Sequence, residues 1–67
     1  MADYRKKTAI DNLDTLIKET GNLRKITERV LEIAEPYSQK SVEDSRYLLL
    51  HYIEKTQQML INIREEM

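Results

Sequence analysis

The chain has 67 residues, of which 40% are hydrophobic and 34% charged, and its formal net charge is −1. This length allows one domain, residues 1–67, and a chain this short buries only about 60% of its unfolded surface. The chain has no cysteine and a single histidine, which excludes disulfides and thiolate metal sites, and we expect no metal and no cofactor. The 11 basic residues do not exceed the 12 acidic ones, which argues against a general nucleic-acid binder because such proteins need a surplus of positive charge.

Hydropathy bears on where the protein works. No window holds the roughly 18 apolar residues of a transmembrane helix. The charged start, Met1–Lys7, is not followed by the apolar segment of a signal peptide. We therefore expect a cytoplasmic protein that does not interact with membranes, and the absence of cysteine fits a reducing compartment. Glycine and proline occur once each, so turns are few and the elements must be long.

Residues 3–35 form the first predicted helical element, which carries two apolar stripes. The stripes comprise Ile10, Leu13, Ile17 and Thr20, and then Leu23, Ile26, Val30 and Ile33. At 100° per residue the second stripe is rotated by about a quarter turn or more from the first. Gly21 and Asn22 lie between the stripes and could end one helix and start another. The segment is either one bent helix or two helices with a tight turn. We favour one long element, bent or locally broken near Gly21, which Pro36 then ends.

The second predicted helix covers residues 42–66 and follows a loop at residues 36–41. Ser41 and Asp44 resemble a capping box at its start. One face, typical of a coiled-coil seam, then recurs at spacings of three and four. It consists of Val42, Ser45, Leu49, Tyr52, Thr56, Met59 and Ile63. Leu48, Ile53, Leu60 and Met67 widen it into a stripe that suits a globular helical core. The short loop makes the two helices antiparallel neighbours. We therefore predict an all-α antiparallel helical hairpin, with Leu49, Tyr52, Met59 and Ile63 packed against the first helix.

Apolar residues outside this seam point to a partner. Tyr47, Leu50 and Ile61 project from another side of the second helix. The misaligned stripes of the first helix likewise leave a surplus of apolar residues that the hairpin seam cannot bury. Two helices cannot cover both surpluses, so we predict a partner interface at Tyr47, Leu50 and Ile61 with a polar rim. The partner is either a second copy, which would complete a four-helix bundle, or a different protein chain.

Catalytic and DNA-binding interpretations have less support. His51 is the one conventional base, and nothing near it in the sequence supplies a triad or a set of metal ligands. Gly21 stands alone, so no glycine-rich phosphate loop is present. Residues 16–23 resemble the centre of a helix-turn-helix motif, with Gly21 in the turn. Thr20, Asn22 and Thr27 stand where that motif requires apolar residues, which argues against it. We expect a protein that is not an enzyme.

One family resemblance rests on the second half of the chain. The run Leu48–Glu54, continued by Met59–Ile63, resembles the second helix of the small hairpin co-chaperones of type III secretion needle subunits. The turn at Pro36–Ser41 also falls in a similar place. The resemblance implies a cytoplasmic helical hairpin that pairs with a repeat-helix chaperone and helps to keep the needle subunit unpolymerised. It transfers no individual functional residue to this chain.

Overall fold

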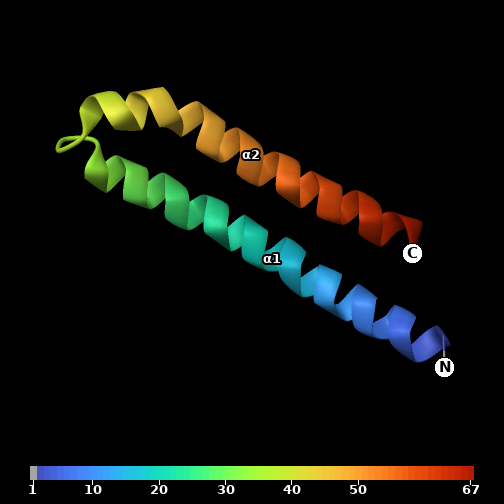
Figure 1. Cartoon of the computed structure of the whole chain (residues 1–67). Helices are drawn as coiled ribbons and strands as arrows, with labels where there is room; N and C mark the ends of the chain where they lie inside the picture. The colour runs from blue at the N-terminus through green and yellow to red at the C-terminus, as the bar shows by residue number, and fades with distance from the viewer. Residues whose placement is uncertain (1) are drawn as a thin grey trace.

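The protein is a hairpin of two long α-helices. The computed structural model describes residues 2–67 and the side chains from Tyr4 onward, and it contains α1 (Ala2–Ala34) and α2 (Gln39–Glu66). The helices run antiparallel and side by side, so the two termini lie at the same end (Figure 1). The hairpin is elongated, measuring 54 × 16 × 11 Å along its principal axes. The predicted all-α helical hairpin is confirmed.

The connection between the helices is shorter than the sequence predicts. The Ala34 carbonyl accepts hydrogen bonds from the backbone N–H groups of Tyr37 and Ser38, both at 2.9 Å. The Ser38 carbonyl then accepts the N–H of Val42 at 2.9 Å, so α2 starts at Gln39. The predicted start near residue 42 and the capping box at Ser41 are therefore wrong. The physical reason is that Gln and Lys, at positions 39 and 40, are good helix formers that extend the helix by one turn.

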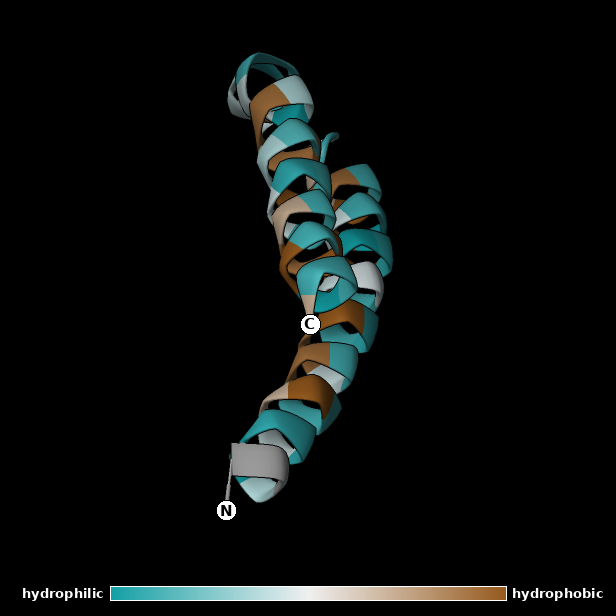
Figure 2. Ribbon diagram, turned by 90° about the vertical axis from the view of Figure 1, so that its right-hand side faces the viewer, coloured by the Kyte–Doolittle hydropathy of each residue, from teal (hydrophilic) through white to brown (hydrophobic). Residues whose placement is uncertain are grey.

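Helix α1 continues through Gly21 without a break, so the predicted interruption is wrong and the single long helix is confirmed. The helix follows a gentle curve instead (Figure 2). Gly21 provides space for the opposite helix, because a Cβ at this position would lie 3.1 Å from Nε2 of Gln57. That same Nε2 donates a hydrogen bond to the Ile17 carbonyl at 3.0 Å. The glycine therefore serves a close approach between helices and not a turn.

The seam between the helices follows spacings of three and four residues on both chain segments. Half-buried or buried positions of the seam include Ile10, Leu13, Ile17, Thr20, Thr27, Leu31 and Ala34 in α1, and Val42, Arg46, Leu50, Ile53, Gln57, Leu60 and Arg64 in α2. Among residues 4–67, only Leu31 and Val42 are fully buried apolar side chains, at 8% and 5% exposure. Both lie near the loop. Towards the termini the seam is thinner and includes polar side chains.

The predicted core of α2 is wrong. Leu49, Tyr52, Met59 and Ile63 are all exposed, and the seam instead follows the positions one residue further along, such as Leu50, Ile53 and Leu60. One residue corresponds to about 100° of rotation around the helix. Both stripes have helical spacing, and the more continuously apolar one is the natural prediction. Val42, at the start of that stripe, is buried in the seam as predicted. The structure places the rest of the stripe, from Leu49 to Ile63, on the outside of the hairpin.

Candidate protein-interaction surface

Large apolar side chains cover one face of the hairpin. Each is between 44% and 64% exposed. We call this surface the apolar face; it consists of Leu16, Leu23, Ile26, Val30 and Ile33 from α1 and Leu49, Tyr52, Thr56, Met59 and Ile63 from α2, with Thr56 as its exposed polar member. Hydrophobic segments recur along both helices in Figure 2. A patch of this length is larger than the scattered apolar residues of an ordinary surface.

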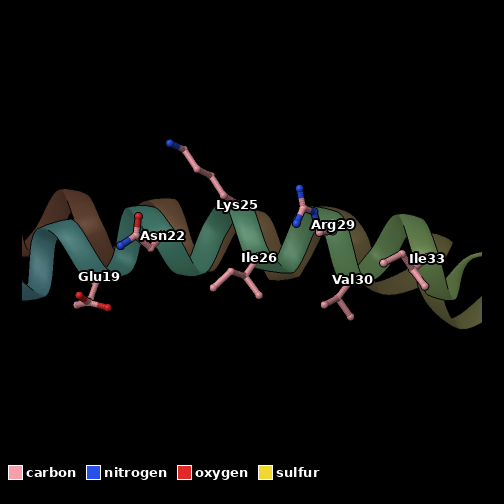
Figure 3. A pocket seen from close by; sticks show the side chains of 7 residues that line it. All are labelled: Glu19, Asn22, Lys25, Ile26, Arg29, Val30 and Ile33. Atoms are coloured by element: carbon pink, nitrogen blue, oxygen red, sulfur yellow. The ribbon is translucent and has the colours of Figure 1, made fainter.

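The α1 half of the apolar face is a regular stripe. Ile26, Val30 and Ile33 follow Leu23 at steps of three and four, so they line one side of the helix. Figure 3 shows Ile26 and Val30 pointing to the same side of α1, with Lys25 directed away from them. These apolar side chains line a shallow depression together with polar neighbours. The stripe is therefore apolar at its centre and polar at its border, as protein interfaces are.

A groove joins the two halves of the apolar face. It is lined by Thr20, Leu23, Leu49, Tyr52, Ile53 and Thr56, so residues of both helices meet there. Leu23 and Leu49 occupy equivalent positions beside the seam, one on each helix. Because the two stripes border the same groove, they lie on the same side of the hairpin. The two stripes therefore meet at this groove through Leu23, and Ile26, Val30 and Ile33 continue the α1 stripe away from it.

Charged residues gather on the opposite edge of the hairpin. Three ion pairs connect the helices, namely Arg24–Glu54 at 2.8 Å, Arg46–Glu35 at 3.2 Å and Arg64–Asp14 at 3.0 Å; we call this side the charged edge. Asp14 and Glu35 are separated by whole heptads, which places them on one side of α1. Each pair is partly exposed and contributes little stability. Their position separates charge from the apolar face.

The predicted interface residues do not form one exposed patch. Tyr47 is 73% exposed and lies on the charged edge, in a depression that also contains Leu50 and His51. Its ring stacks on His51 with 5.7 Å between centroids. Leu50 and Ile61 are half-buried, so the hairpin itself already covers much of their surface. The assignment of these three residues as partner contacts stays a prediction.

The apolar face contains two stripes for which the sequence predicts other roles. The α2 stripe from Leu49 to Ile63 is predicted to form the hairpin seam. The two α1 stripes, including Leu23 to Ile33, are predicted to leave apolar surface uncovered, without a location relative to α2. The signal that could have separated seam from surface was Gln57 opposite Gly21, because a long polar side chain needs a small residue across the seam.

Two other kinds of feature are not found in the described part of the chain, namely a metal-binding cluster and a membrane-spanning helix. Among these residues, no three His, Asp or Glu side chains lie close enough together to hold a metal ion. Neither helix, over the residues that the structure describes, combines the length and the apolar character needed to cross a membrane. Comparison with protein-family models, curated proteins and solved structures finds no match for this chain. The geometry defines an all-α helical hairpin with one apolar and one charged side.

Proposed function

We propose that this protein is a non-enzymatic interaction module that presents its apolar face to the helices of another protein chain. The observation that carries the proposal is the segregation of the surface. Most of the exposed large apolar side chains of the two helices belong to the apolar face, and the ion pairs between the helices lie on the charged edge, together with Tyr47. A hairpin that worked as an isolated monomer would have no need for an apolar surface of this length.

Energetic considerations support the same function. Full burial of a large apolar side chain contributes about 1.5–3 kcal/mol, so the half that remains exposed is worth about 1 kcal/mol for each residue of the face. Summed over the face, this is comparable to the cost of association. The hairpin's own buried core, Leu31 and Val42 in the described residues, is small for a chain of this length. Helical scaffolds of this size usually need a further source of stability, and a partner can supply it.

A co-chaperone role in the cytoplasm is the more specific form of this proposal. The stretches that resemble the needle-subunit co-chaperones, residues 48–54 and 59–63, contain Leu49, Tyr52, Met59 and Ile63 of the apolar face. This coincidence supports a face that pairs with chaperone helices. A homodimeric regulator is the alternative use of the same face. The helix-turn-helix alternative has lost its basis, because α1 runs through Gly21 without a turn.

The proposal is tested by the size of the native assembly. In extracts of cells that naturally produce the protein, prepared under non-denaturing conditions, the chain should elute well above its mass of 8.0 kDa. Val30→Glu combined with Tyr52→Glu should shift it to the size of the free chain, because two buried carboxylates cost more than the contact contributes. Tyr47→Glu, at the more exposed tyrosine of α2 on the charged edge, is the comparison variant, because it tests the competing prediction that the partner contacts Tyr47. Elution of the parent chain as a monomer would contradict the proposal, as would an assembly that the double variant leaves unchanged.

A further inference from the structure

We propose that the occupant of the apolar face is a second copy of this chain, so that two hairpins pack face to face in a two-fold symmetric four-helix bundle. This inference rests on the proposed function, because it identifies the partner of the same surface. It follows from the dimensions of the face, its composition and the thin core of the single hairpin.

The dimensions of the hairpin match a stable dimer. Helix α2 has 28 residues, which at 1.5 Å per residue is about 42 Å of overlap between the helices. The hairpin is 16 Å wide across its two helices. A second hairpin would thus cover a footprint of roughly 700 Å² on each copy, close to the ~800 Å² per partner of standard protein interfaces. The apolar face, which spans about 26 Å of α1 from Leu16 to Ile33, would form the centre of this footprint, with polar residues around it. A single docked helix would leave about half of the face exposed.

The composition of the face suits self-association. A two-fold interface places the same patch of both copies in contact, so the patch must be complementary to itself. At the central groove the small side chains of Thr20 and Thr56 lie beside the larger Leu23, Leu49 and Tyr52, which provides both projections and recesses. The net charge of −1 gives two copies little reason to repel one another.

The charged groups of the hairpin also favour this arrangement. Arg24, Arg46 and Arg64 are already paired with carboxylates of the same chain on the charged edge. In a face-to-face dimer this edge remains in water, where such pairs are tolerated without a desolvation cost. The dimer therefore buries the apolar face and leaves the charge of each copy in solvent.

Sedimentation equilibrium of the purified full-length chain is the first test. The parent protein should have twice the 8.0 kDa chain mass. Val30→Glu and Tyr52→Glu should each weaken the dimer at least tenfold, and Tyr47→Glu should change its dissociation constant by less than twofold. A parent chain that stays at 8.0 kDa overturns the second copy as occupant. A dimer that Tyr47→Glu disrupts and Tyr52→Glu does not would also overturn it.

A crosslinking experiment keeps the test independent of variants that fail to fold. Thr56 is exposed and lies midway between Leu49 and Ile63, and the chain has no native cysteine. Thr56→Cys should give a covalent dimer with a bis-maleimide that spans roughly 10 Å, one interhelical distance. His51→Cys, exposed on the same helix away from the face, is the matched control and should give at least tenfold less dimer. Equal yields from the two variants, or none from Thr56→Cys, would refute the face-to-face arrangement.

The two proposals fail in distinguishable ways. A purified chain that is monomeric but part of a larger native assembly would overturn the second copy alone, and the face would then belong to a different protein. A chain that is monomeric both when purified and in native extracts would overturn both. A purified dimer with the expected variant pattern supports the interaction module and the second copy, and it counts against the co-chaperone form of the proposed function.

Discussion

Replacement of Gly21 by alanine offers a quantitative test of how the two helices meet. Gly21 lies in the interior of α1, where alanine is favoured over glycine by about 1 kcal/mol. The added Cβ would lie 3.1 Å from Nε2 of Gln57, which is closer than an ordinary contact. The amide of Gln57 must therefore move by a few tenths of an ångström, and this weakens its 3.0 Å hydrogen bond to the Ile17 carbonyl.

Whether Gly21→Ala stabilises or destabilises the protein depends on how much free energy the weakened Gln57 hydrogen bond loses. A neutral hydrogen bond contributes about 0.5–1.5 kcal/mol to stability. The Ile17 carbonyl also stands at the acceptor position for the N–H of Gly21 within α1, so weakening the Gln57 bond does not leave it without a partner. The glutamine side chain is flexible at its end and can retain part of the bond. We expect Gly21→Ala to raise the free energy of unfolding by about 0.5 kcal/mol, half of the propensity gain.

The assay is a double-mutant cycle with Gln57→Ala, measured by urea unfolding followed by circular dichroism at one fixed protein concentration. In the Gln57→Ala background the obstruction is gone, and Gly21→Ala should yield the full gain of about 1 kcal/mol. Gly21→Leu serves as the control for size and should destabilise the parent, because its side chain cannot fit beneath Gln57. The reasoning is refuted if Gly21→Ala destabilises the parent by more than about 1 kcal/mol. It is also refuted if the gain is the same in both backgrounds.

Two further predictions concern the core and the charged edge. Leu31→Ala should lower the free energy of unfolding by about 2–4 kcal/mol, because it removes one of the buried side chains next to the loop and leaves a cavity. An unchanged thermal melt would show that this position is not part of the core. Arg46→Met should change the free energy of unfolding by less than about 1 kcal/mol, because the ion pair with Glu35 is partly exposed. The difference from the parent should shrink in 1 M salt. A large effect that persists in salt would contradict the small contribution expected of this pair.

The sequence by itself determined the fold class, and local chemistry explains why. Long stretches with helical periodicity are interrupted by a single proline, and Pro36 cannot continue a helix. A short connection then leaves only an antiparallel arrangement for two long helices. The sequence also indicated that the apolar surface exceeds what one hairpin can bury. These conclusions depend on neighbours in the chain, so they could be reached without knowledge of any tertiary contact.

Only the tertiary structure decided which stripe of each helix faces inward. In α2 two stripes have equivalent spacing, one through Leu49, Tyr52 and Met59 and the other through Ile53 and Gln57. Periodicity cannot distinguish them, and the more apolar stripe was the natural prediction. In a two-helix hairpin the seam is narrow and open to water on both sides, so long polar side chains at the seam can bury their stems and keep their polar ends hydrated. Gln57 lies across from Gly21 and satisfies its amide with the Ile17 carbonyl of the other helix. The more apolar stripe is left outside, where it is available to another chain.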